Sequence, residues 1–116
     1  MGGTLGQQAV ARLRARIICG AANNQLTTTE IGQVLVERGI VYAPDYVVNA
    51  GGMLNASGDF FGRYDPDEVW RGVHAIRDTT AKVLETAARE RRPPHDVADA
   101  MAQAIIEDRR SRSSRA

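Results

Sequence analysis

The sequence of 116 residues is poor in the features that mark disulfide scaffolds and metal-binding proteins. It has one cysteine, Cys19, so no internal disulfide can form, and we expect a small buried thiol at the end of a strand. The two histidines, His74 and His95, have no partners at metal-ligand spacing, and His95 is expected in a turn. The sequence therefore predicts no metal site.

The sequence also lacks long apolar runs. None approaches the roughly 20 apolar residues of a membrane-spanning helix. The first residues lack the basic segment followed by an apolar segment that marks a signal peptide. These absences predict a protein without a membrane partner, in a reducing, cytoplasmic setting.

Positive charge is concentrated near the C-terminus. The net charge is +1, but four of the 15 basic residues lie near the end: Arg109, Arg110, Arg112 and Arg115. Without these four, the 14 acidic residues outnumber the basic ones. The mildly acidic remainder argues against a nucleic-acid partner, and residues 111–116 are expected to form a disordered basic tail.

The first half of the sequence predicts a strand, a loop, a helix and a second strand. Residues 7–14 favour a helical turn or two, and residues 15–19 and 40–43 are short β-branched runs. Thr27 followed by Glu30 is typical of a capping box, and Gly39 suits the end of the helix between the strands. Short connections of this kind favour a parallel βαβ unit, with both asparagine loops at the same edge of the sheet.

The second half predicts two helices. Asp65, Pro66 and Glu68 stand in the order expected for a helix start, and apolar residues then recur at helical spacing to about residue 91. Trp70 is expected to pack beside this apolar stripe. A last helix follows the prolines at 93 and 94, with four residues expected to point inward: Val97, Met101, Ala104 and Ile105.

Two segments identify a family. Residues 20–26 read GAANNQL and residues 39–52 read GIVYAPDYVVNAGG. In this order and spacing, they resemble the cofactor domain of the glutamate/leucine/phenylalanine/valine dehydrogenases, and the resemblance extends over nearly the whole chain. It implies an α/β fold with a partial Rossmann-like parallel sheet (one βαβ unit) followed by C-terminal helices. The expected division is a partial dinucleotide-binding domain at 1–64, helices packing on it at 65–110, and the tail at 111–116.

The resemblance also implies an activity and its cofactor site. Members oxidise an amino acid with NAD, giving a 2-oxo acid and ammonia, and the leucine, valine and phenylalanine enzymes are the most similar in style. The residues that match cofactor-contacting positions of the family are Gly2, Ala22, Asn23, Asn24 and Asn49. An uncharged amide suits such a place because it both donates and accepts hydrogen bonds. The plain alternative is that the asparagines at 24 and 49 only cap helices.

Asn49 also matches a substrate-contacting position, together with Met53 and Ala56. The last two lie three residues apart on one side of a predicted helix, and neither carries a charge. They therefore disfavour a dicarboxylate substrate and favour a branched-chain or aromatic amino acid. Ordinary core packing is the alternative for this pair.

No residue matches the catalytic lysine and aspartate of the family, which lie in an N-terminal substrate domain. The only lysine, Lys82, falls inside the long predicted helix. We therefore predict no catalytic residue, and we expect the chain to be inactive alone and to associate with itself or with that missing domain. The alternative is a non-catalytic remnant that binds a nucleotide or a partner weakly.

Overall fold

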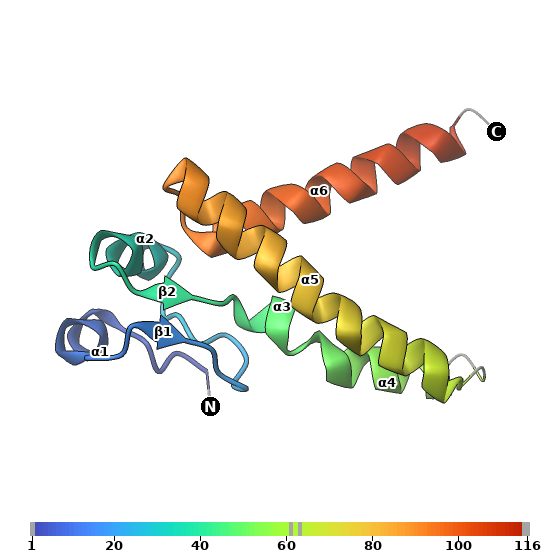
Figure 1. The fold of residues 1–116 in the computed structure, drawn as a ribbon, viewed down its shortest axis with the longest axis horizontal. Helices are drawn as coiled ribbons and strands as arrows, with labels where there is room; N and C mark the ends of the chain where they lie inside the picture. Colours follow the sequence, from blue (N-terminus) through green and yellow to red (C-terminus); the bar gives the residue numbers. More distant parts are fainter. Residues whose placement is uncertain (1, 61, 63, 115–116) are drawn as a thin grey trace.

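The computed structural model describes residues 2–60, 62 and 64–114, and within them the chain is α-rich with one small parallel sheet. The elements in chain order are α1 (Gln7–Arg12), β1 (Ile17–Ile18), α2 (Glu30–Glu37), β2 (Val41–Tyr42), α3 (Asp45–Val48), α4 (Ala50–Phe60), α5 (Pro66–Glu90) and α6 (Pro94–Ser113). Figure 1 shows α1 and α2 beside the sheet, α5 running past α3 and α4, and α6 leaving from the C-terminal end of α5.

The predicted parallel βαβ arrangement is present. Strands β1 and β2 pair in parallel, with Ile17 opposite Val41 and Ile18 opposite Tyr42. The strands are shorter than the sequence predicted. Cys19 lies beyond the paired residues and is exposed, so the expectation of a buried thiol is wrong. Burial would require an element to cover the end of β1, and none among the described residues does so.

A second pairing was not foreseen. Leu5 forms an isolated parallel bridge with Leu26, and the Thr27 amide donates to the Leu5 carbonyl at 3.1 Å. The Thr27 hydroxyl also donates to that carbonyl, at 3.3 Å. Helix α2 therefore begins only at Glu30, and the predicted capping box led by Thr27 is wrong, because the hydroxyl is used between segments rather than at the helix start.

The end of α2 agrees with the prediction. Gly39 has φ of +67°, a conformation that costs glycine no steric strain. Its amide donates to the Val36 carbonyl, and the amide of Ile40 donates to the Leu35 carbonyl. This pair of bonds is a Schellman motif, which satisfies the last carbonyls of the helix and turns the chain into β2.

Two small cores hold the fold together. The first lies between the sheet, α1 and α2, and its buried members are Val10, Ile31, Leu35, Ile40 and Tyr42. The second lies where α5 meets α6, and its buried members are Val83, Ala87, Val97 and Ala98. Val47 of α3 packs against the second core, so α3 connects the sheet region to the long helices.

Helix α5 begins as the sequence predicted. The Asp65 carboxylate accepts from the amide of Asp67 at 2.9 Å, and Pro66 occupies the first turn. The apolar stripe is buried only toward the C-terminal end, at Val83 and Ala87. Trp70, near the start of the helix, is 63% exposed, so the expectation that it packs beside the stripe is wrong in this chain.

Helix α6 starts earlier and runs further than expected. Because prolines are tolerated in the first helical turn, His95 lies in α6 rather than in a turn and is buried. Val97 is buried and Met101 half-buried, but Ala104 and Ile105 are exposed, because α6 has by then diverged from α5 (Figure 1). The helix includes residues 111–113 of the expected tail, and residues 115–116 lie outside the described part of the chain.

Candidate functional site

The loops that follow β1 and β2 lie side by side, as the parallel pairing requires. The Asn49 carboxamide donates to the carbonyl of Gly20 at 3.3 Å. The backbone amide of Asn24 donates to Oδ2 of Asp45 at 2.7 Å. The edge of the sheet that carries both asparagines is thus one continuous surface, which we call the asparagine edge (residues 20–26 and 43–49).

Gln25 braces the first loop from within. Its side chain is only 5% exposed, and its amide nitrogen donates to the carbonyls of Gly20 and Ala22 at 2.9 and 2.8 Å. These bonds hold the loop in a tight arc that leaves Asn23 and Asn24 exposed. Analysis of the sequence missed Gln25, although a glutamine inside a loop rich in small residues was the available indication.

The N-terminal segment lies against the first loop of the asparagine edge. The amide of Gly3 donates to the Asn24 carbonyl. A Cβ atom at Gly2 would lie 3.1 Å from the Asn23 carbonyl oxygen, so glycine permits this close approach. The structure therefore brings together Gly2, Asn23 and Asn24. These residues come from separate segments, and the family resemblance assigned all three to the cofactor site.

The capping alternative for the asparagines is not supported at Asn24. Helix α2 begins well after this residue, and its N-cap is Thr29. Asn49 is the C-cap residue of α3, where its backbone amide donates to the Asp45 carbonyl, and its side-chain nitrogen joins the two loops. At Asn49, a place at a helix end and a place on the asparagine edge therefore coexist.

A polar pocket of about 290 Å³ adjoins this edge between the first loop, α3 and α6. Tyr42 donates to Oδ1 of Asp45 at 2.6 Å, and Tyr46 donates to Oδ1 of Asp99 at 2.7 Å. Burial and then the adjacent carboxylate raise the pKa of each tyrosine hydroxyl well above its usual range. These hydroxyls are therefore donors at neutral pH, and the pocket presents fixed hydrogen bonds rather than a mobile proton.

Met53 and Ala56 lie on the open face of α4. Met53 is 78% exposed, and Ala56 is also exposed. The residue of α4 that faces α5 is Leu54, whose side chain would meet a Cβ at Gly72 at 3.0 Å. Core packing within this chain therefore does not account for Met53 and Ala56.

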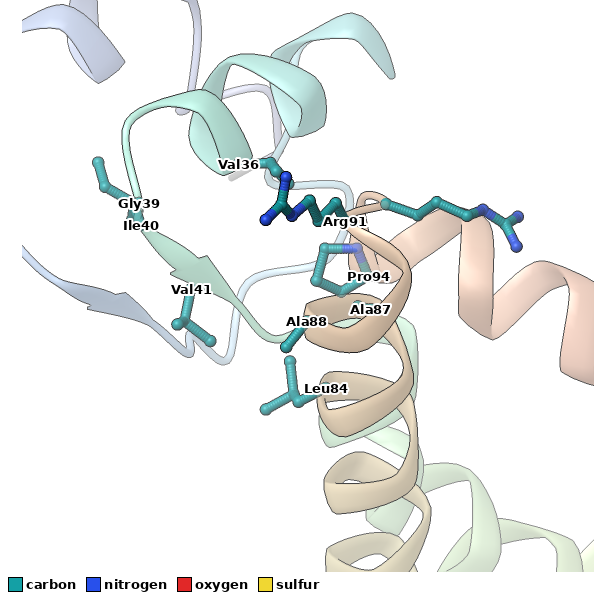
Figure 2. A pocket seen from close by; sticks show the side chains of 10 residues that line it. Val36, Gly39, Ile40, Val41, Leu84, Ala87, Ala88, Arg91 and Pro94 are labelled. Atoms are coloured by element: carbon teal, nitrogen blue, oxygen red, sulfur yellow. The ribbon is translucent and has the colours of Figure 1, made fainter.

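A larger groove, of about 380 Å³, lies between the end of α2 with β2 and the end of α5. Figure 2 shows its apolar walls, formed by residues such as Val36, Ile40 and Leu84, with Arg91 among the side chains at the groove. None of the predicted site residues lines it. Its charged lining residues are Arg91 and Arg92, and the rest of the lining is apolar or glycine.

The described residues contain no group of three or more histidine, cysteine or carboxylate side chains placed to hold a metal ion. Among the same residues, no helix combines the length and apolar content needed to cross a membrane.

Known proteins resemble this chain closely. The sequence profile of the "Glutamate/Leucine/Phenylalanine/Valine dehydrogenase" family matches residues 3–111. Leucine dehydrogenase of Bacillus subtilis is 42% identical over 114 residues, which are 97% of this chain and 31% of that enzyme. Valine dehydrogenase of Streptomyces albus is 39% identical over 112 residues, 97% of this chain and 30% of that enzyme.

A solved structure shares the fold. The crystal structure of L-tryptophan dehydrogenase from Nostoc punctiforme superimposes with a TM-score of 0.85 at 38% identity, covering 92% of this chain and 32% of that one. The chain therefore spans about a third of the length of the relatives it matches.

Proposed function

The chain belongs to the glutamate/leucine/phenylalanine/valine dehydrogenase family, and from this we propose that it is the C-terminal, Rossmann-like cofactor-domain portion of a cytoplasmic NAD-dependent amino-acid dehydrogenase. The parent activity would be the reversible oxidative deamination of a branched-chain or aromatic L-amino acid. A hydride leaves the amino-acid Cα, and water hydrolyses the resulting imine to a 2-oxo acid and ammonia. Bound NAD would supply the hydride acceptor.

The observation that best supports this proposal is the asparagine edge. Hydrogen bonds within the chain fix the backbone of Asn24 and the carboxamide of Asn49, so both residues have a defined place at the edge before any ligand arrives. Uncharged amides donate and accept without placing a charge beside a developing nicotinamide cation. We therefore assign cofactor contacts to Gly2, Ala22, Asn23, Asn24 and Asn49.

The substrate side is proposed to be the open face of α4. Met53 and Ala56 are exposed there and uncharged, so they suit the apolar side chain of an amino acid once another part of the enzyme covers them. Asn49, at the start of the same helix, would hold the substrate carboxylate. The partners of the parent enzyme would be NAD, the amino acid, and either a second copy or the N-terminal domain.

A chimera tests the proposal. The matching third of Bacillus subtilis leucine dehydrogenase is replaced by this chain, and NADH formation is followed with leucine. We expect the chimera to form NADH, and we expect Asn24→Ala and Asn49→Ala each to lower kcat/KM at least about tenfold. The control Gln103→Ala removes an exposed carboxamide on α6 and should have no effect. A folded chimera without NADH formation, or with activity indifferent to both asparagines, would refute the proposal.

The second candidate is a non-catalytic remnant that binds a nucleotide or a partner weakly. Both candidates predict the same behaviour for the purified chain alone, so the chimera is what separates them. No residue here matches the family's proton-transfer machinery, whose loss typically costs about 10²–10⁴-fold. We expect no NADH formation by the chain with leucine, valine or phenylalanine, and only weak NAD binding by calorimetry.

A further inference from the structure

Asp45 is a buried carboxylate that connects the two strands' loops. It is 6% exposed, and each of its oxygens accepts one hydrogen bond. Oδ1 accepts from the Tyr42 hydroxyl at 2.6 Å, and Oδ2 accepts from the backbone amide of Asn24 at 2.7 Å. Both distances are short, as expected for bonds to a carboxylate.

The residue that receives this contact has an unusual backbone. Asn24 has φ of +52°, in the left-handed region that few residues other than glycine adopt and that asparagine tolerates best among them. Its carbonyl accepts from the amide of Gly3, so the peptide groups on both sides of Asn24 are held. A conformation of this kind persists when its surroundings determine it, and it is frequent at functional sites.

Tyr42 completes the arrangement. It is 2% exposed within the core beneath the sheet, so its ring cannot move without disturbing that core. Its hydroxyl fixes one oxygen of Asp45 and thereby aims the other oxygen at Asn24. The Asp45 carboxylate thus links the exposed loop residue Asn24 to Tyr42 in the core.

We infer that the Tyr42–Asp45 pair is a positioning device that holds Asn24 in its left-handed conformation and so orients the Asn24 carboxamide on the asparagine edge. Neither residue contacts a reacting atom in this arrangement. The part that concerns the cofactor rests on the proposed function, whereas the positioning of the loop does not.

Amide hydrogen exchange of the 116-residue chain tests the positioning directly. Asp45→Ala should lower the protection of the Asn24 amide at least about tenfold, while the amides of Leu35 and Val83 keep their protection. Asp45→Asn retains an acceptor of the same shape and should restore part of the protection. Tyr42→Phe, which keeps the ring in the core, should give a smaller loss at the same amide.

The matched control is Asp99→Ala. It removes a carboxylate that lines the same polar pocket but accepts from Tyr46 and not from the loop, so Asn24 should stay protected. Unchanged Asn24 protection in Asp45→Ala, with the core amides still protected, would overturn the inference. Equal losses at Asn24 and in the core for Tyr42→Phe would also overturn it, since the pair would then be merely structural.

The leucine dehydrogenase chimera tests the consequence for the cofactor. Asp45→Ala should raise the KM for NAD more than the KM for leucine, and Asp45→Asn should recover part of that difference. If the chimera never uses NAD, the proposed function fails and the exchange result stands by itself. If Asp45→Ala leaves Asn24 protected in an active chimera, the positioning inference alone fails.

Discussion

The asparagine edge and the outer face of α4 are adjacent along the chain, yet they differ in what they present to solvent. At the edge, the polar groups are paired within the chain: Asp45 and Asn49 bond to the neighbouring loop, and Gln25 bonds within its own loop. On α4, the large apolar side chain of Met53 is 78% exposed. The polar groups of the edge find their partners within this chain, whereas the apolar face of α4 is not covered by any of the residues that the structure describes.

The same contrast appears along helix α5. Its C-terminal end is buried against α6, with Val83 at 1% exposure, whereas Trp70 near its start is 63% exposed. Hydrophobic burial stabilises only the surface that is removed from water. We therefore expect stability to depend on the two small cores, and association to depend on the exposed faces.

The largest effect is expected from a substitution in the first core. Leu35→Ala removes a fully buried side chain and should lower the free energy of unfolding by about 2–5 kcal/mol. Met53→Ala, on the open face of α4, should change it by no more than about 0.5 kcal/mol. Urea denaturation measures both, and similar losses for the two variants would mean that the α4 face is not open in solution.

A pair of glycines on two helices gives effects of opposite sign. A Cβ at Gly32 of α2 would overlap Cε1 of the His95 ring, so Gly32→Ala should push α6 away from α2 and cost about 1–3 kcal/mol. A Cβ at Gly52 of α4 would meet nothing within 4 Å, and Gly52→Ala should stabilise the chain by about 0.5–1 kcal/mol. Thermal melting of both variants checks the pair. A Gly32→Ala variant that melts like the parent would show that α6 does not dock on α2.

The raised pKa values of two tyrosine hydroxyls, of buried Tyr42 and of half-exposed Tyr46, predict a loss of stability at alkaline pH. The pKa values of Tyr42 and Tyr46 are raised in the folded chain, chiefly by burial, above the ordinary value of 10.0. The unfolded chain therefore loses these protons first, and the free energy of unfolding should stay level below about pH 10 and fall above it.

Urea denaturation between about pH 8 and about pH 11 measures this slope. Tyr42→Phe should flatten the fall, because one titrating group is removed. Tyr64→Phe is the control, since Tyr64 is 50% exposed and its hydroxyl donates to the exposed Asn55 side chain at 3.2 Å. A fall that is unchanged in Tyr42→Phe would contradict the prediction.

The smallest effect is expected on self-association. Exposed apolar side chains on α4, α5 and α6 favour association of the isolated chain. Trp70→Ser should weaken it a few-fold, whereas Arg71→Ser, a neighbouring change on the exposed surface, should not. Size-exclusion chromatography with light scattering measures the change. A parent chain that stays monomeric at high concentration would show that these faces do not associate.

Local features were predicted well where neighbouring residues decide them. The Asp65–Pro66 start of α5 and the Gly39 end of α2 depend on caps and backbone conformations within a few residues. Features that depend on contacts between distant segments were predicted poorly. Thr27 was expected to cap a helix and instead bonds to Leu5, because the N-terminal segment pairs beside it.

The spacing of apolar residues likewise did not predict which side chains are exposed. Ile105 has the spacing of an inward residue, but it is 56% exposed because α6 diverges from α5 before that position. Cys19 follows two isoleucines, as a buried strand end often does, but β1 ends at Ile18 and Cys19 is exposed. Helical spacing defines which residues share a face, and it does not say what that face meets.

The sequence by itself determined the family, the parallel strand–helix–strand order, and the presence of two asparagine loops at one edge, because motif order and turn chemistry are properties of the local chain. Only the tertiary structure decided how those loops are held. The bonds of Asp45 to Tyr42 and Asn24, and of Asn49 to Gly20, join residues from separate segments whose distances depend on how the strands pack. The sequence around position 45 reads the same whether the Asp45 carboxylate lies in a solvated turn or is buried between the two loops. The burial of Tyr42 beneath the sheet distinguishes the two cases.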